Sequence, residues 1–294
     1  MRILLTGANG QLGRELQPRA VRRGFTTAAT DLPALDITDG AAVAAALAAH
    51  HPDVVVNAAA YTAVDRAESD SAAAFAVNRD GPAVLARACA ERELPLVHVS
   101  TDYVFDGEKD GAYGEDDPVA PLGVYGASKE AGERAVRAAC PRHVILRTSW
   151  LFSPFGSNFV KTIVRLARDR DELRVVVDES GCPTAAGDLA EVILALLPCL
   201  PARGPGPFGT YHVAGAGAVT RHAFAAAIVA EARAFWPLRV QRVVPIGSAE
   251  WPTPVRRPKN SALCCARLRD TFRLVPRPWR EGLHEALAAL AAAS

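Results

Sequence analysis

The sequence has almost no net charge and no long apolar run. Its 294 residues carry 33 Lys and Arg against 32 Asp and Glu, which leaves a formal net charge of +1. Because the charges are almost balanced, the sequence shows no excess of basic residues that would bind nucleic acid or an anionic membrane. A local anion site is still compatible with this balance. No stretch approaches the roughly 18 apolar residues of a transmembrane helix. We therefore expect neither a nucleic acid nor a membrane among the partners.

Paired cysteine motifs are also missing. The six cysteines show neither CxxC spacing nor a zinc-type pairing with histidine; they are Cys89, Cys140, Cys182, Cys199, Cys264 and Cys265. The opening apolar run, MRILL, ends in a glycine-rich turn and is too short for the apolar part of a signal peptide. These features predict reduced, mostly packed thiols and a cytoplasmic protein.

What is present, over the first 150 residues, is an alternation of short apolar runs with helical patterns. Strand-like runs lie at residues 2–5, 25–30, 53–57, 94–100 and 143–149, and helical patterns lie at 11–23, 41–50, 72–92 and from 123 onward. Such alternation predicts βαβ units and a parallel sheet whose strands are buried on both faces.

The pattern loosens after residue 150. We expect a helix at 158–168, a strand at 174–178 and a helix at 188–197, followed by a surface loop in the Pro/Gly-rich stretch PCLPARGPGPFG. The remainder predicts a small irregular region that closes on the main sheet, with helix surface in the alanine-rich runs, including the tail.

A glycine-rich turn, TGANGQLGRE, follows the first predicted strand. Gly7, Gly10 and Gly13 form GxxGxxG rather than the standard GxGxxG fingerprint. Glycines permit a tight turn with close backbone approach, and the following helix N-terminus faces a pyrophosphate. With a strand before it and a helix after it, the turn predicts dinucleotide binding more strongly than an ordinary βα turn.

Two residues near this turn give opposite indications about the cofactor. Asp31 lies 18 residues after Gly13 at the end of the second predicted strand, where an acidic residue typically bonds the ribose 2′-hydroxyl of NAD. Arg14, beside the turn, would instead favour the 2′-phosphate of NADP. Asp31 could also be a plain turn residue, so the choice between NADPH and NADH stays open.

The stretch GVYGASKEAGE places Tyr125 four residues before Lys129 in a predicted helix. The two residues then share one helix face, about 6 Å apart along the axis. An isolated YxxxK is more often an amphipathic helix residue beside a solvated lysine. A dinucleotide site changes this balance, because hydride transfer to a carbonyl requires a proton donor. A neighbouring ammonium lowers a phenol pKa from its usual value near 10. We therefore predict Tyr125 as the general acid and Lys129 as the group that tunes it.

Thr101 is the predicted third member of the site. It lies in STDYVFDG, where the fourth predicted strand ends, and ligands of open parallel sheets bind at such strand ends. Its hydroxyl could hold the substrate carbonyl. On its own it could equally be a strand-end cap.

Several motifs then carry a resemblance to a known family. They are LLTGANGQLGREL, NAAAYTAVDRAE, STDYVFDG, PLGVYGASKEAGE, RTSWLF, GCPT and RRPKNS. In this order, over nearly the whole chain, the sequence resembles the extended short-chain dehydrogenase/reductases and, within them, the dTDP-4-dehydrorhamnose reductase family. The resemblance implies an α/β fold: a Rossmann-type doubly wound parallel sheet with a smaller C-terminal substrate-binding region. Residues 1–150 would form the dinucleotide-binding domain, to which segments near 170–215 return, and 151–294 mainly the substrate-binding region.

The resemblance also implies an activity and roles for residues. The activity is NADPH-dependent reduction, with NADH possible, of the C4 ketone of dTDP-4-dehydro-L-rhamnose, and Lys129 would also hold the nicotinamide ribose. Catalytic positions are Thr101, Tyr125 and Lys129. Cofactor positions are Gly7, Asn9, Gly10, Gln11, Leu12, Gly13, Asp31, Asp36, Ile37, Ala58, Ala59 and Ala60. Positions near the sugar are Val64, Thr101, Asp102, Tyr103 and Trp150, the last of which could instead be a core aromatic.

Some features stay open. Cys264 stands where the family usually has Asp or Asn, which bears on the C-terminal substrate wall. Glu15 matches a glutamate of magnesium-linked dimers in the family, but glutamate at a helix start is also favourable with the helix dipole, and we assign no metal ligand. The sequence does not choose between monomer and homodimer. Two alternatives remain: a 4-ketoreductase of another dTDP-4-keto-deoxysugar, and a non-catalytic NADP-binding regulatory subunit.

Overall fold

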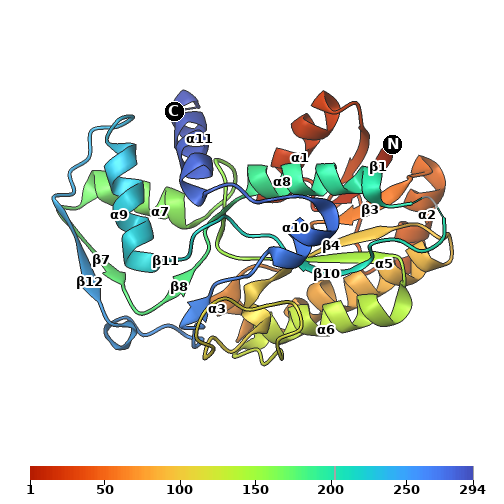
Figure 1. Ribbon diagram of the computed structural model, residues 1–294, viewed down its shortest axis with the longest axis horizontal. Coiled ribbons are helices and arrows are strands. Elements are labelled where there is room, and N and C mark those ends of the chain that lie inside the picture. The colour runs from red at the N-terminus through yellow and green to blue at the C-terminus, as the bar shows by residue number, and fades with distance from the viewer. Residues whose placement is uncertain (202, 294) are drawn as a thin grey trace.

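The computed structural model describes residues 1–201 and 203–293. Its main element is a six-stranded parallel sheet in the order β10-β5-β4-β3-β1-β2, on the right in Figure 1. The strands are β1 (Arg2–Thr6), β2 (Thr26–Thr30), β3 (Val54–Asn57), β4 (Leu96–Thr101), β5 (His143–Thr148) and β10 (Gly209–His212). The chain runs outward from β1 to β2 and then back past β1 to β3, so a topological switch point lies between β1 and β3.

Helices cover both faces of this sheet, as Figure 1 shows. One layer contains α1 (Gln11–Arg22) and α8 (Ala186–Leu196), and the other contains α2 (Gly40–His50), α5 (Gly81–Ala90) and α6 (Val124–Ala139). Ile3 and Leu5 pack towards the first layer, whereas Leu4 between them packs towards the second. Successive residues of a strand point to opposite faces of the sheet. Because both faces of β1 are covered by helices, consecutive residues of this strand are apolar. The predicted doubly wound α/β fold is confirmed.

The helix predicted over 72–92 is interrupted by one wide turn. It consists of α4 (Ser71–Phe75), a π-helical segment η1 (Ala76–Asp80) and α5. The wide turn holds the buried Asn78, whose amide bonds both backbone groups of Tyr61 at 2.8 and 3.0 Å and the hydroxyl of Ser128 at 3.0 Å. The segment after β3 is thereby tied to α6. Periodicity alone does not reveal such a turn, because it alters the helix locally.

A second part of the molecule, on the left in Figure 1, forms its own core. Its larger elements are α7 (Phe159–Asp169), β7 (Glu172–Val176), α9 (Arg221–Ala232), β12 (Arg242–Ile246) and α11 (Trp279–Ala292). Phe224 is the centre of an aromatic cluster there, with ring contacts to Trp150, Phe152 and Trp279. Of the segment near 170–215, α8 and β10 join the main sheet and its layers, whereas β7 pairs with β12 in a separate sheet.

After residue 209 the alanine-rich runs form helices, as expected, but α9 and α11 pack in the second core rather than on the main sheet, and the region is otherwise more regular than predicted. It contains α9, α10 (Ala266–Phe272) and α11. Alanine-rich runs favour helix, and Thr220 caps α9 by accepting a hydrogen bond from the backbone of Ala223 at 3.1 Å. The short elements are α3 (Val64–Ala67), η2 (Asp102–Val104), β6 (Leu151–Phe152), β8 (Ser180–Gly181), β9 (Thr184–Ala185), η3 (Leu197–Cys199), β11 (Val219–Thr220), η4 (Ser248–Glu250) and β13 (Asn260–Ser261).

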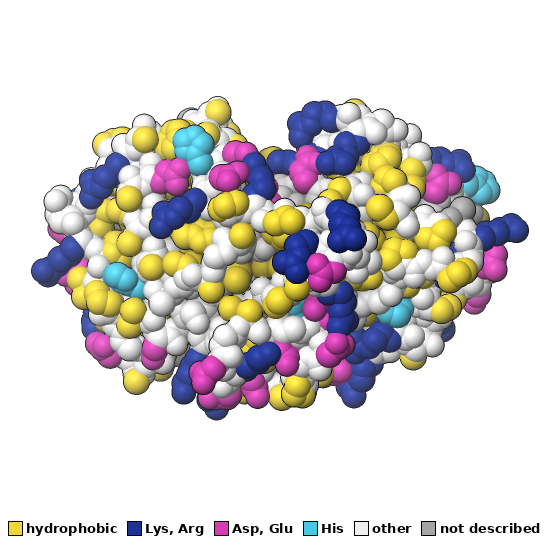
Figure 2. Space-filling model, in the orientation of Figure 1, with side chains coloured by type: hydrophobic (Ala, Val, Ile, Leu, Met, Phe, Trp, Pro, Cys, Tyr) yellow, Lys and Arg dark blue, Asp and Glu magenta, His cyan; other side chains and the backbone are white. Residues whose placement is uncertain are grey.

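The surface carries both charges in mixture. Figure 2 shows basic and acidic side chains interspersed over one face of the molecule. Over the described residues, no helix combines the length and the apolar character needed to cross a bilayer. All six cysteines are described, and none of them forms a disulfide.

Candidate functional site

A cavity of about 630 Å³ lies at the carboxyl ends of the main strands, next to the switch point. Apart from Asn9 and Gly13, every residue that the sequence placed in the site lines this cavity, which we call the cleft. They are Gly7, Gly10, Gln11, Leu12, Asp31, Asp36, Ile37, Ala58, Ala59, Ala60, Val64, Thr101, Asp102, Tyr103, Tyr125, Lys129 and Trp150. Asn9 and Gly13 lie in the glycine turn itself, whose packing shapes the cleft.

The glycine turn is closely packed and fits a bound pyrophosphate. Gly7 has φ +73°, and a Cβ there would lie 2.5 Å from the backbone nitrogen of Ala59; a Cβ on Gly13 would collide with Gly7. Gly10 caps α1 without any side-chain acceptor for the first helical amides, and the first turn has no acidic residue. Unsatisfied amides at a helix N-terminus bind anions, so these residues fit the diphosphate of a dinucleotide.

Asp31 lies at the cleft but its carboxylate already has partners. It accepts hydrogen bonds from the backbone nitrogens of Asn9 and Leu32, each at 2.8 Å, and so ties the end of β2 to the glycine turn. Arg14 lies with its guanidinium 4.3 Å from the ring centre of Phe155 and does not line the cleft. Of the two residues that gave opposite indications about the cofactor, Asp31 lines the cleft and Arg14 does not.

Asp36 and Ile37 form the far end of the cleft, ahead of α2. The Asp36 carboxylate accepts from the backbone nitrogen and the hydroxyl of Thr38, both at 2.8 Å. Ile37 is buried against Gly81, where a Cβ would lie 2.5 Å from the isoleucine side chain. The glycine at the start of α5 therefore leaves room for an apolar wall.

Tyr125, Lys129 and Thr101 all line the cleft. Lys129 is only 2% exposed, and its Nζ donates to the backbone oxygen of Val99 at 2.7 Å. Thr101 ends β4 and donates through Oγ1 to Asp102 Oδ1 at 2.9 Å. The phenol of Tyr125 forms a hydrogen bond with Thr101. The spacing of four in α6 thus puts phenol and ammonium on one face, beside the hydroxyl from β4.

The expected lowering of the phenol pKa by Lys129 is not what the structure shows. Burial raises the pKa of Tyr125 above its ordinary value, and the hydrogen bond with Thr101 opposes this only in part. Burial also lowers the pKa of Lys129 to about 8. Sequence spacing could not indicate this, because desolvation depends on the elements packed around the helix. In this state Tyr125 keeps its proton at neutral pH and is a weaker acid than a free phenol.

Aromatic and polar side chains form the other wall. The ring of Tyr103 lies edge-on to that of Tyr125, with centroids 5.5 Å apart. Trp150 has φ +48° and packs against Gly181, where a Cβ would lie 2.5 Å from the indole. Trp150 therefore lines the cleft and packs on the second core at once. Asp102 is buried and also accepts from Ser149 Oγ at 3.2 Å.

Arg221 is a cleft residue that the sequence interpretation missed. Its guanidinium lies 3.7 Å from the ring centre of Trp150, and its Nε lies 3.5 Å from Glu179. Lys129 and Arg221 are the lysine and arginine residues among those that line the described cavity. Arg221 is the first residue of α9, behind its Thr220 cap. A threonine before an alanine-rich run is a helix-start signal, and it would have placed this arginine at a helix N-terminus.

Two further residues named in the sequence lie apart from the cleft. Glu15 is 7% exposed, accepts from Ser153 Oγ at 3.0 Å and pairs with Arg19. Within the described part of the chain, no group of three or more His, Cys, Asp or Glu residues could hold a metal ion. Cys264, where the sequence departs from the family pattern, does not line the cleft.

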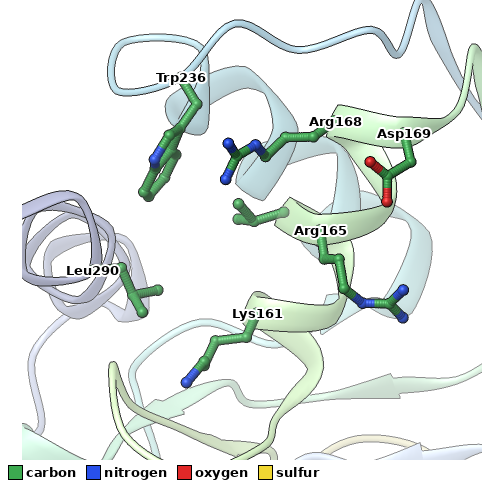
Figure 3. Close-up of a pocket in the computed structure, with 7 residues that line it drawn as sticks. Lys161, Arg165, Arg168, Asp169, Trp236 and Leu290 are labelled. Carbon is green, nitrogen blue, oxygen red and sulfur yellow. The ribbon is translucent and has the colours of Figure 1, made fainter. Parts of the chain in front are cut away.

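A second hollow, of about 310 Å³, lies between α7, α11 and the segment that carries Trp236. Figure 3 shows Arg168 directed towards Trp236, whereas Arg165 points away from it. None of the residues that line this hollow lines the cleft, and none was predicted as a site residue. It is an amphipathic depression in the surface of the second part of the molecule, separate from the cleft.

A turn for a dinucleotide beside a protonated phenol suits the transfer of hydrogen to or from a carbonyl, which places the protein among the dinucleotide-dependent oxidoreductases. A family model described as the RmlD substrate binding domain matches residues 1–292. The chain belongs to this family, the dTDP-4-dehydrorhamnose reductases.

Its similarity to individual members extends over nearly the full length. The chain is 43% identical to the dTDP-4-dehydrorhamnose reductase of Aggregatibacter actinomycetemcomitans, covering 96% of this chain and 97% of the relative. It is also 42% identical to a Streptomyces antibioticus protein named as a probable dTDP-4,6-dihydroxy-2-methyloxan-3-one 4-ketoreductase, covering 100% and 97%.

Solved structures are similar in the same way. A dTDP-4-dehydrorhamnose reductase of Clostridium acetobutylicum superposes with a TM-score of 0.92 at 39% identity, covering 99% of both chains. The enzyme of Bacillus anthracis, solved in complex with NADP, superposes with a TM-score of 0.91 at 36% identity, covering 98% of this chain and 99% of that one.

Proposed function

We propose that this protein reduces the C4 ketone of dTDP-4-dehydro-L-rhamnose to give dTDP-L-rhamnose, with NADPH as the reductant and NADH as a possible substitute. The observation that carries the proposal is the meeting of Tyr125, Thr101 and Lys129 in the cleft that the glycine turn also lines. Membership of the reductase family supports the choice of substrate. The complex of the Bacillus anthracis relative with NADP supports the choice of cofactor.

The chain's own residues supply the proton and the charge stabilisation. When bound, the dinucleotide provides the hydride. Tyr125 donates its proton to the oxygen of the ketone, so that hydride and proton together complete the alcohol. The hydroxyl of Thr101 hydrogen-bonds to the same oxygen and stabilises the charge that develops there. Lys129 stabilises the phenolate that Tyr125 becomes, and holds the ribose next to the nicotinamide.

The remaining roles follow from position along the cleft. The residues of the glycine turn would hold the diphosphate, with Asp36 and Ile37 near the adenine and residues 58–60 beside the cofactor. Tyr103, Trp150 and Asp102 would orient the sugar, because they line the wall that faces Tyr125. We also propose that the protein acts in the cytoplasm, and its unbridged cysteines support this.

The experiment that tests this function compares a panel of dTDP-4-keto-6-deoxy sugars under identical conditions. We expect the largest kcat/KM for dTDP-4-dehydro-L-rhamnose. The panel is needed because of the Streptomyces antibioticus relative, which is as similar as the rhamnose enzymes and bears the name of a different 4-ketoreductase. Faster turnover of another sugar would replace our substrate by that one. Binding of NADPH without reduction of any sugar would indicate the regulatory subunit.

Arg221 should contribute to binding of the nucleotide sugar. The substrate diphosphate is anionic. Of the two cations that line the cleft, Lys129 donates to Val99, whereas Arg221, at the start of α9, lies against the ring of Trp150. We expect Arg221→Gln to raise the KM for the nucleotide sugar about tenfold or more, with little change in kcat, because a charged hydrogen bond is lost. Steady-state kinetics with saturating NADPH measures this.

The matched control is Arg165→Gln, which removes an exposed cation of α7 outside the cleft. It should leave both constants unchanged. An unaltered KM in Arg221→Gln would show that the diphosphate binds elsewhere.

A further inference from the structure

Glu133 is a buried carboxylate that the proposed mechanism does not use. It lies one helical turn after Lys129 on α6, is 0% exposed and does not line the cleft. Tyr125, Lys129 and Glu133 are spaced by four residues, so they share one face of the helix. Along this face, starting at the cleft, the order is the phenol of Tyr125, the ammonium group of Lys129 and the carboxylate of Glu133.

The carboxylate of Glu133 is bound through both oxygens. Oε1 accepts from Ser100 Oγ at 2.6 Å and from Arg147 Nε at 2.9 Å. Oε2 accepts from Arg147 Nη2 at 2.7 Å and from Arg137 Nη1 at 2.9 Å. The two-point bond to Arg147, which is 3% exposed on β5, sets the orientation of the carboxylate as well as its distance.

These bonds hold α6 where Lys129 needs it. Ser100 follows Val99 on β4, and the backbone oxygen of Val99 accepts the hydrogen bond from Lys129 Nζ. One short stretch of β4 therefore contacts α6 twice, once through the ammonium group and once through Glu133. A rotation of α6 that displaced Lys129 would have to break the bonds of Glu133 to Ser100 and Arg147.

Glu133 also affects the charge of Lys129. Burial acts to raise the pKa of Glu133, but the hydrogen bonds and charge of Arg147, together with the hydrogen bonds from Ser100 and Arg137, outweigh it and hold that pKa below its ordinary value. The carboxylate is therefore ionised. Burial lowers the pKa of Lys129 to about 8, and the negative charge of Glu133 acts against this lowering.

The other groups around Lys129 do not provide such a counter-charge. His98, on β4, is buried, and burial together with Lys129 lowers its pKa, so the ring is neutral. Arg79 and Asp80, on η1, pair with each other at the surface. At the cleft, Tyr125 keeps its proton and the carboxylate of Asp102 is bound by hydroxyls, including those of Thr101 and Ser149.

We propose that Glu133 is a positioning residue of the reductase: its carboxylate locks α6 onto β4 and β5 and keeps Lys129 charged at the pH of catalysis. This inference rests on the proposed function, in which a charged Lys129 holds the cofactor ribose and stabilises the phenolate. Glu133 touches neither the cofactor nor the substrate, and it acts through Lys129.

The test is the pH dependence of the variant Glu133→Gln, which keeps the shape of the side chain and removes its charge. In the wild type, kcat/KM and NADPH affinity should fall as the pH rises through about 8, where Lys129 loses its proton. In Glu133→Gln this fall should occur about one pH unit lower or more, because an opposing charge is gone. NADPH affinity is read from nucleotide fluorescence, which requires no turnover.

Two variants provide the comparison. Glu133→Asp retains the charge and should keep the wild-type pH at which activity falls, even if its activity is lower overall. Glu130→Gln removes a carboxylate next to Lys129 that pairs instead with Arg134 at 3.0 Å, and its profile should also be unchanged. A purely structural role for Glu133 would lower stability or activity without moving the pH profile.

The outcome decides the proposal in each case. A folded Glu133→Gln protein with the wild-type profile overturns it. If this variant does not fold because Arg147 is left unpaired, the double variant Glu133→Gln/Arg147→Met is compared with the single variant Arg147→Met, which lacks the same buried cation, and the fall should occur at a lower pH in the double variant. The same pH in both variants would likewise overturn the proposal. If the wild type binds NADPH but reduces no dTDP-4-keto sugar, the proposed function fails, and the binding profile still decides the role of Glu133.

Discussion

Replacing Tyr125 by Phe should lower kcat by about two orders of magnitude or more, the range expected when a general acid is lost. The physical reason is that the ketone oxygen gains negative charge during reduction, and in the proposed mechanism the phenol of Tyr125, which lines the cleft, is the proton donor. Burial raises the pKa of Tyr125, so the phenol carries its proton at neutral pH but is a weaker acid than a free phenol, and the proposed transfer depends on Lys129 to stabilise the phenolate. Steady-state oxidation of NADPH with the nucleotide sugar measures the loss.

The control for this variant is Tyr103→Phe. It removes the hydroxyl of another tyrosine in the same cleft, whose ring centroid lies 5.5 Å from that of Tyr125. This variant should alter the KM for the sugar far more than kcat. NADPH affinity of Tyr125→Phe should stay close to that of the wild type, since the aromatic ring and Lys129 remain. Wild-type turnover in Tyr125→Phe would rule out the mechanism, whatever the identity of the sugar.

Replacing Lys129 by Met should reduce both turnover and cofactor affinity. We expect kcat to fall about a hundredfold, because the phenolate loses its stabilising charge, and the KM for NADPH to rise about tenfold, because a charged hydrogen bond to the ribose is lost. Kinetics at several NADPH concentrations separate the two effects. A change in affinity alone would show that Lys129 does not assist the proton donor.

Stability provides an independent check on Lys129→Met. The lysine is 2% exposed, and burial disfavours its charge, so an apolar side chain of similar length should not lower the melting temperature much. Glu133 would keep its bonds to Arg147, Arg137 and Ser100. A large loss of stability would mean that the lost activity reflects unfolding, and the kinetic comparison would then need Lys129→Arg.

Features that depend on short-range spacing were accessible from the chain alone. The alternating pattern predicted the five strands of the first 150 residues. It was clearest for β3, which is buried throughout and therefore mostly apolar, whereas β2 (Thr26–Thr30) lies at the sheet edge and is only partly buried. The glycine turn and the YxxxK spacing predicted which residues lie together, since each depends on local backbone geometry. The fold class and the set of residues around the cleft followed from these patterns and from the family motifs.

Features that depend on partners distant in sequence were not accessible in this way. Arg221 reaches the cleft from the start of α9, which the sequence interpretation did not connect with the site, and β7 pairs with β12 about 70 residues further on. The direction of the Tyr125 pKa was wrong because spacing shows the nearby lysine but not the loss of water around the phenol.

The order of residues along the chain was therefore enough to specify the dinucleotide turn, the helix face with phenol and ammonium, and the strands that lead to them, because these arise within a few residues of one another. Packing of distant segments determined how acidic the phenol is, that Arg221 lines the same cleft, and that the buried Glu133 lies one turn beyond the lysine. The reason is that burial and long-range charge pairs exist only once the two cores have closed around the cleft.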